Sequence, residues 1–204
     1  MRRALATLLL ACGLGACAFE RPASDVPVSY DFGPPPAYAR ANPALPGTVL
    51  VSRIRAPAWL EDDSIVYRLA YEDAARTRAY ALSRWAAEPA DLMTERLRSR
   101  MAAISAGVVS PAFGARSDYT LRVELDDFSQ HFEAPGASRV LLRARATLLQ
   151  SERRTLIAQR EFDIALTAPP NAPGAVKALT DATHQFLEAV GTWAVESARG
   201  AGPK

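Results

Sequence analysis

The side chains that could do chemistry are few and far apart in this sequence. The chain has two histidines, His131 and His184, and their wide separation gives poor support for a metal site, which needs three or four converging ligands. The adjacent carboxylates Asp126 and Asp127 are predicted to point to opposite faces of a strand, so they cannot share a proton. The sequence contains neither a Gly-x-Ser-x-Gly elbow nor a glycine-rich phosphate loop. We therefore expect no catalytic residue, no metal and no cofactor.

The N-terminal residues have the pattern of an exported lipoprotein. Two arginines at positions 2 and 3 precede an apolar stretch that ends at residue 16. At about 1.5 Å per residue this stretch is too short to cross a hydrocarbon core of ~30 Å, which favours a cleaved leader. It ends in Leu-Gly-Ala-Cys at residues 14–17, which resembles the bacterial lipobox. We predict a signal peptide at residues 1–16 and a lipid anchor on Cys17.

The residue after the anchor and the charge balance indicate a location and exclude one class of partner. Ala18 stands where an inner-membrane lipoprotein of enteric bacteria has aspartate, which favours the outer membrane, on its periplasmic side.

Two of the 24 basic side chains lie in the leader, so the number of basic side chains in the remainder equals the 22 acidic ones. A neutral body lacks the clustered positive charge that nucleic acid requires. An ordinary leader with an incidental cysteine is the alternative for Cys17, and Cys12 is a poorer second lipobox candidate.

Proline content divides the mature chain into a tether and a body. Residues 18–47 hold seven of the 15 prolines, a composition that favours extended backbone. We predict an acylated tether at residues 17–47, in which residues 30–33 are a candidate short edge strand. Residues 48–199 are predicted to form one globular α/β domain, and residues 200–204 a flexible tail.

Hydrophobic periodicity predicts the elements of this domain. Period-two alternation indicates strands, whereas apolar residues three and four apart indicate helices. We expect strands at 48–55, 65–71, 80–85, 119–126, 140–148 and 156–166, and helices at 89–105 and 175–198. The predicted fold class is therefore α+β: a single domain with a mostly antiparallel or mixed sheet of about six strands and two main helices, in which a β-β-β-α unit occurs twice. Its second sheet segment is predicted to be an antiparallel meander with turns at 135–136 and 153–154.

Aromatic and arginine side chains on strands and loops are the remaining functional candidates. Tyr, Trp and Arg are the usual anchors of protein–protein interfaces. The candidate partner-binding residues are Trp59, Tyr67, Arg68, Tyr80, Trp85 and Phe128. For each of them, packing in the core or at its rim is the alternative.

Two blocks of the sequence resemble the ABC-type transport auxiliary lipoproteins, a family that includes the PqiC-type subunit of MCE lipid-transport systems. The first comprises residues 57–60 (Pro-Ala-Trp-Leu), residues 65–68 (Ile-Val-Tyr-Arg) and residues 80–89, which lead into the first helix. The second comprises residues 121–130 (LRVELDDFSQ), followed by Phe132. The likeness runs from about Tyr30 to Trp193.

The resemblance implies a non-enzymatic lipoprotein of the outer membrane that works beside an ATPase, a permease and an MCE-domain protein. Such systems are thought to move phospholipid or other hydrophobic molecules between membranes. We therefore expect an accessory subunit that docks an MCE-domain protein and is held to the lipid bilayer through Cys17. The alternative is an outer-membrane lipoprotein that regulates a cell-wall synthase, because its anchor, tether and domain would look much the same.

Overall fold

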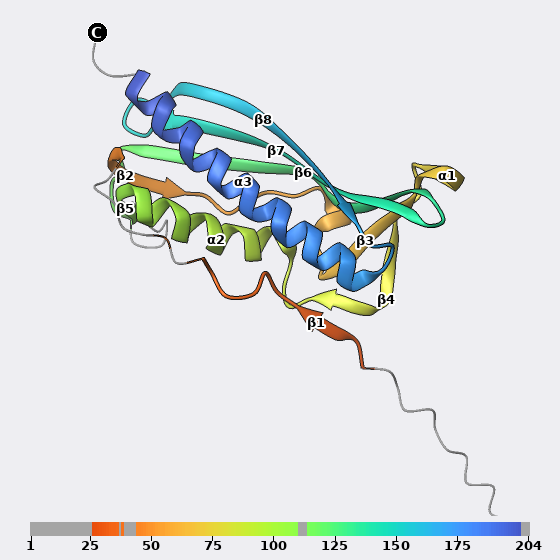
Figure 1. Ribbon diagram of the computed structural model, residues 1–204. Helices are drawn as coiled ribbons and strands as arrows, with labels where there is room; N and C mark the ends of the chain where they lie inside the picture. The colour runs from red at the N-terminus through yellow and green to blue at the C-terminus, as the bar shows by residue number, and fades with distance from the viewer. Residues whose placement is uncertain (1–25, 37, 39–43, 110–113, 201–204) are drawn as a thin grey trace, which may run out of the picture.

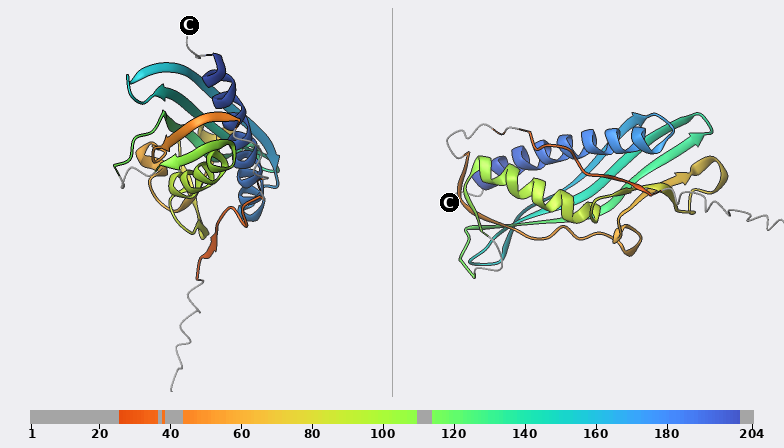
Figure 2. Two further views of the ribbon diagram at one scale, coloured as in Figure 1. Left: turned by 90° about the vertical axis from the view of Figure 1, so that its left-hand side faces the viewer. Right: turned by 90° about the horizontal axis from the view of Figure 1, so that it is seen from below.

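The computed structural model describes residues 26–36, 38, 44–109 and 114–200. These residues form two layers: an eight-stranded mixed sheet and two long helices that lie across one face of it (Figures 1 and 2). We call this side the helix face and the opposite side the outer face. Within the described ranges, no helix has the length and apolar character needed to cross a membrane.

The long strand β6 (Tyr119–Ala134) lies at the centre of the sheet. Along one edge it pairs with β7 (Ala137–Gln150) over nearly its whole length, and β7 pairs in turn with β8 (Thr155–Ala168). Both pairings are antiparallel, and the first turn lies at Pro135 and Gly136. The predicted three-strand meander is therefore confirmed.

Two shorter groups of strands share the other edge of β6. Near the start of β6, β2 (Leu45–Val51) pairs with it in parallel, and β5 (Ser105–Val109) adds in parallel beside β2. Further along, β3 (Ser64–Leu69) pairs in parallel with β6. Beside β3 lies β4 (Arg78–Trp85), antiparallel, and beside β4 lies the short strand β1 (Val28–Tyr30), parallel.

The two long helices begin where the local sequence allows a helix to start. In α2 (Pro89–Ile104), Pro89 occupies the first turn, where its missing N–H costs nothing. In α3 (Ala172–Gly200), the Asn171 side-chain oxygen accepts a hydrogen bond of 2.8 Å from the Gly174 N–H. A Cβ at Gly174 would lie 2.5 Å from a backbone oxygen, so this tight entry into the helix requires glycine. Two short helices, η1 (Ala58–Leu60) and α1 (Ala70–Asp73), flank β3.

A bulge in β6 overturns the prediction for the paired carboxylates. Leu125 and Phe128 are both buried on the helix face, although strict alternation would put them on opposite faces. One extra residue in β6 shifts the register between Leu125 and Asp127, so Asp126 and Asp127 both lie toward the outer face. Asp127 therefore stands opposite Arg143 of β7.

The predicted fold class is confirmed: the described chain is one α+β domain with a mixed sheet and two main helices. The two β-β-β-α units are β2–β3–β4–α2 and β6–β7–β8–α3. Two additional short strands, β1 and β5, bring the sheet from about six strands to eight. Of these, β5 occupies a segment expected to be a loop, and α2 ends just before it at Ile104.

The globular body begins earlier in the chain than the proline pattern indicated. The strand expected at residues 30–33 is β1, at Val28–Tyr30, and Phe32 just after it is 2% exposed. The ring of Phe32 packs 5.3 Å from that of Trp85 and 6.1 Å from that of Phe128, as centroid distances. The predicted leader, Cys17 and residues 201–204 lie outside the described residues.

This aromatic cluster gives the first testable prediction. Phe128→Ala should lower the free energy of unfolding by about 3–5 kcal/mol, because it removes a fully buried ring and leaves a cavity. Equilibrium unfolding in denaturant measures the change. Leu156→Ala, at a side chain that is 57% exposed, is the control and should change stability by no more than about 0.5 kcal/mol. A loss below ~1 kcal/mol for Phe128→Ala would show that this ring is not part of the core.

Candidate docking surface

Two of the six candidate partner-binding residues belong to the core, which corrects the expectation for them. Trp85, at the end of β4, and Phe128, just after the bulge in β6, are each 1% exposed. Their ring centroids lie 5.7 Å apart. A partner cannot reach either side chain in the folded domain, so their role is to hold β4 and β6 together. Alternation alone could not reveal this, because the bulge sets the direction of Phe128.

Tyr67 and Tyr80 form a half-buried pair between β3 and β4. Their ring centroids lie 4.8 Å apart, and the ring of Phe132 lies 5.7 Å from that of Tyr67. The Tyr80 hydroxyl donates a hydrogen bond of 2.6 Å to the side-chain oxygen of Gln130. Burial, with a smaller contribution from Tyr67, raises the pKa of Tyr80 to about 12. The pair is therefore fixed in place, with part of each ring at the surface.

The Gln130 side chain links the elements around Tyr67 and Tyr80 through hydrogen bonds. It is not among the candidates that the sequence pattern indicates. It is fully buried on the helix face of β6, and its side-chain amide donates to the Ser138 hydroxyl at 2.7 Å and to the Pro169 carbonyl at 2.9 Å. The Ser138 hydroxyl donates in turn to the Ala168 carbonyl at 2.8 Å. This network joins β4, β6, β7 and the end of β8. The only sign of this role in the sequence is a polar residue between two aromatic ones, Phe128 and Phe132.

Trp59 and Arg68 form a stacked pair on the outer face. The Arg68 guanidinium lies 4.8 Å from the ring centroid of Trp59, and it also donates to the carbonyl oxygens of Ala74 and Ala75 just after α1. Arg68 therefore fixes both the indole in η1 and the segment after α1. Both side chains are partly exposed, which makes them accessible to a partner.

A polar cluster lies beside this pair on the same face. His131 pairs with Arg68 in the β3–β6 register, so their side chains share the outer face. The Ser129 hydroxyl donates to an Asp127 carboxylate oxygen and lies 3.1 Å from His131 Nε2. That nitrogen lies 3.4 Å from the other Asp127 oxygen. Because Ser129 is fully buried and its hydroxyl already donates to a carboxylate, it is not placed to act as a nucleophile.

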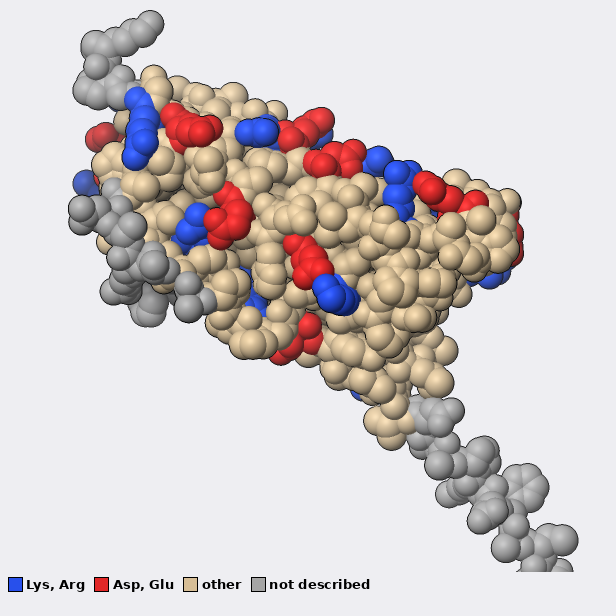
Figure 3. Space-filling view, viewed as in Figure 1, with Lys and Arg blue, Asp and Glu red and all other residues tan. Residues whose placement is uncertain are grey.

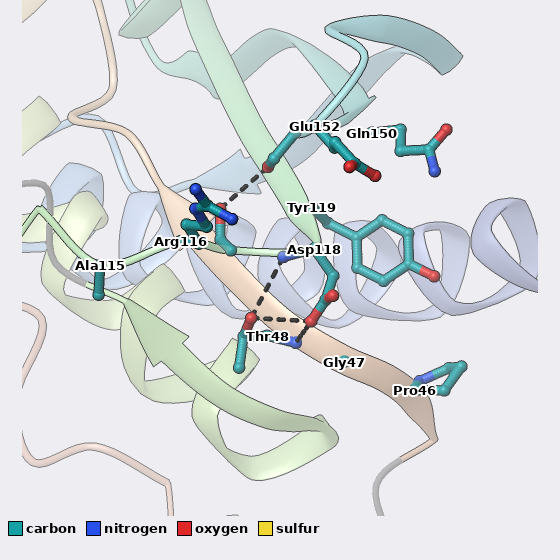
Figure 4. A pocket seen from close by; sticks show the side chains of 11 residues that line it. Pro46, Gly47, Thr48, Ala115, Arg116, Asp118, Tyr119, Gln150 and Glu152 are labelled. Atoms are coloured by element: carbon teal, nitrogen blue, oxygen red, sulfur yellow. Dashed lines mark hydrogen bonds between the residues drawn. The ribbon is translucent and has the colours of Figure 1, made fainter.

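A surface hollow lies where β2 and β6 begin, at the end of the sheet far from Trp59 and Arg68 (Figure 4). Asp118 accepts hydrogen bonds from the Thr48 N–H at 2.7 Å and from the Thr48 hydroxyl at 2.9 Å, and these bonds lower the pKa of Asp118. Gly47 has φ of +116°, and a Cβ there would lie 2.8 Å from an Asp118 oxygen. The carboxylate is thus used to hold the start of β2.

Metal-ligating side chains do not gather anywhere in the described part of the chain. His184 is half-buried in α3, and its Nε2 is buried without a hydrogen-bond partner among the described residues.

In the β3–β6 register Tyr67 pairs with Gln130 and therefore shares the helix face, where Tyr80 packs against it. The accessible candidates on the outer face are Trp59 and Arg68, which we call the docking surface. Aromatic and arginine side chains held in fixed positions suit protein recognition.

The buried hydroxyl of Tyr80 gives a pH-dependent prediction. An unfolded tyrosine ionises near pH 10, whereas folded Tyr80 keeps its proton to about pH 12. Between these values the unfolded state binds fewer protons, so the free energy of unfolding should fall as pH rises. Tyr80→Phe should make this fall shallower, and the exposed-site control Tyr71→Phe should not. Denaturant unfolding at several alkaline pH values measures the slope, and equal slopes for wild type and Tyr80→Phe would contradict the prediction.

Solved structures show where this fold occurs in other proteins. A crystal structure of a protein from Xanthomonas campestris matches with a TM-score of 0.68 at 18% sequence identity, covering 85% of this chain and 94% of that one. A second, uncharacterized protein matches with a TM-score of 0.61 at 17% identity, covering 82% and 98%. These likenesses concern the fold alone. A comparison with curated proteins found no significant match.

The family model described as "ABC-type transport auxiliary lipoprotein component" matches residues 30–191, most of the chain. The match runs from the last residue of β1 through most of α3 and includes Trp59, Tyr67, Arg68 and Tyr80. This description names a lipoprotein, and therefore a membrane-associated protein, that is associated with an ABC transport system, and it is not the name of an enzyme class. The expected relationship is confirmed: the chain belongs to the ABC-type transport auxiliary lipoprotein family.

Proposed function

We propose that this protein is a periplasmic accessory subunit of an ABC/MCE-type system that transports lipid or another hydrophobic molecule. It is anchored to the outer membrane through acylated Cys17, and it acts by binding other proteins. The observation that carries the proposal is the coincidence of two independent features. The family match covers residues 30–191, and the chain before it ends its apolar stretch in a lipobox-like sequence at residues 14–17.

The anchor part of the proposal rests on the leader. Cleavage after residue 16 leaves Cys17 as the first residue, and the acyl chains on it make membrane attachment essentially permanent, since each buried methylene contributes about 0.8 kcal/mol. Ala18 in the following position supports sorting to the outer membrane.

The state of the polar side chains supports a role in binding rather than catalysis. Asp118 accepts a hydrogen bond from the Thr48 N–H at the start of β2, and Asp127 accepts a hydrogen bond from the buried hydroxyl of Ser129. These carboxylates have structural partners, whereas the docking surface presents partly exposed Trp59 and Arg68. We infer that an MCE-domain protein, accompanied by its permease and ATPase, binds this surface.

Removing the anchor cysteine tests the location. Cys17→Ser should move the mature protein from the outer-membrane fraction to the soluble periplasmic fraction, because the substituted residue cannot carry the diacylglycerol thioether. Membrane fractionation and intact-mass measurement of the native protein are the readouts. Cys12→Ser, which alters a residue of the leader, is the control. An unmodified Cys17 in a protein that still sediments with membranes would overturn the anchoring proposal.

Removing the exposed indole tests the binding role. Trp59→Ala in a tagged, acylated protein should reduce recovery of the MCE-domain protein from solubilised membranes at least tenfold, because central aromatic anchors often contribute about 2 kcal/mol or more. Leu156→Ala, which changes an exposed side chain at the other end of the molecule, should leave recovery unchanged.

Two further outcomes of this experiment decide against the proposal. Equal recovery with Trp59→Ala would exclude the docking surface as the interface, provided that denaturant unfolding shows both variants folded. Repeated recovery of a cell-wall synthase, without an MCE-domain protein or a permease, would favour the regulatory alternative.

A further inference from the structure

The exposed apolar side chains of this protein gather at one end of it. Among the described residues, five large apolar side chains are exposed. Four of them belong to neighbouring elements: Val26 and Val28 at β1 (79% and 53% exposed), Leu82 in β4 (51%) and Tyr71 in α1 (43%). The fifth, Leu156, begins β8 at the opposite end. We call the end formed by β1, β4 and α1 the apolar end.

Strand pairing places this end of the molecule. Leu69 pairs with Phe132 near the end of β6, and α1 follows Leu69 directly. Because β4 runs antiparallel to β3 and β1 runs parallel to β4, the chain before Val28 points toward the same end. Figure 1 shows the described chain beginning there, at the lower right, and in Figure 3 the surface around that point is mostly free of charged side chains.

The length of chain between this end and the predicted anchor limits where the membrane can be. Val26 is only nine positions after Cys17, so the distance between them is at most about 30 Å at ~3.3–3.6 Å per residue. The strand β6 has 16 residues and is about 50 Å long at ~3.3 Å per residue. The proposed anchor therefore keeps Val26 within about 30 Å of the bilayer, whereas the end that carries Asp118 and the β7–β8 turn can lie much farther away.

We propose that the apolar end rests on the lipid surface, with Val26, Val28, Tyr71 and Leu82 in the interfacial layer of the bilayer. This proposal rests on the acylation of Cys17. Aliphatic side chains and tyrosine both partition favourably into that layer. Two of the nearby arginines have acidic neighbours, since Arg78 pairs with Glu72 at 2.7 Å and Arg84 lies 3.8 Å from Asp63. The short link to the anchor keeps the local lipid concentration high, so a weak contact is sufficient.

This orientation has a consequence for the docking surface. Arg68 pairs with His131 only a few residues from the end of β6, and Trp59 stacks on Arg68. The docking surface is therefore close to the bilayer but on the outer face of the sheet. A partner bound there would meet the membrane beside this protein, whereas the hollow around Asp118 would face the periplasm.

Collisional quenching by lipid tests the orientation. Cys12 leaves with the leader and Cys17 is acylated, so an introduced cysteine is the only free thiol of the mature chain. Leu82→Cys and Glu152→Cys, at the two ends, are labelled with a fluorophore in the acylated protein. The protein is reconstituted in vesicles of phosphatidylethanolamine and phosphatidylglycerol that contain nitroxide-labelled lipid. We expect at least threefold stronger quenching at Leu82→Cys than at Glu152→Cys.

A charge substitution provides the second measurement. With the probe at Tyr71→Cys, Val28→Asp should reduce lipid quenching at least twofold, because a carboxylate opposes insertion into the interfacial layer. Leu156→Asp, at an equally exposed site of the opposite end, is the matched control and should leave quenching unchanged. Both sites are exposed, so neither substitution removes core packing.

The outcomes separate this proposal from the anchoring that it assumes. Intact-mass measurement first establishes whether Cys17 is acylated, and an unmodified cysteine contradicts the anchor itself. If Cys17 is acylated but quenching is equal at Leu82→Cys and Glu152→Cys, only the orientation is wrong. Protection of the Leu82→Cys probe from aqueous iodide, without quenching by lipid, would show that a protein covers the apolar end, which also overturns the proposal.

Discussion

Backbone pairing along both edges of β6 sets the positions of the strand residues Tyr67, Arg68 and Phe128. One edge is fully occupied by β7, and the other is divided between β2 near its start and β3 near its end. The bulge between Leu125 and Asp127 separates these two regions and changes which residues face the helices. Beyond it, Phe128 and Gln130 are inward, and Asp127 and His131 are outward, beside Arg68.

The local patterns of the sequence were sufficient to predict the meander but not the site. Alternation in β7 and β8 and the Pro135–Gly136 turn specify an antiparallel hairpin because each signal is local. The bulge is different, since an extra residue becomes evident only when both strands are paired. The burial of Phe32 likewise depends on Trp85 and Phe128, which are distant in sequence. The resemblance to the family, in contrast, depends on short blocks of the sequence and is confirmed by the match over residues 30–191.

The packing of β1 and Phe32 against the domain bears on how the proposed anchor would act. A tether of thirty residues would let the body move far from the bilayer, whereas β1 pairs with β4 and Phe32 lies in the core. Under the proposed anchoring, Val26, the first described residue, lies nine positions after Cys17. In the orientation that we propose, the protein presents one end to the lipid and one face to a partner. That geometry suits a subunit that joins a transport assembly to the membrane.

The central claim is that the outer face near Trp59 binds a transport partner at the membrane. Its most direct measurement is photo-crosslinking in living cells, with a photoreactive amino acid in place of Ala58, an exposed neighbour of Trp59. The proposed function predicts a crosslinked product that contains an MCE-domain protein, identified by mass spectrometry, and no such product when the photoreactive residue replaces Glu152 on the distal turn. A product containing a cell-wall synthase, or the same products from both positions, would contradict it.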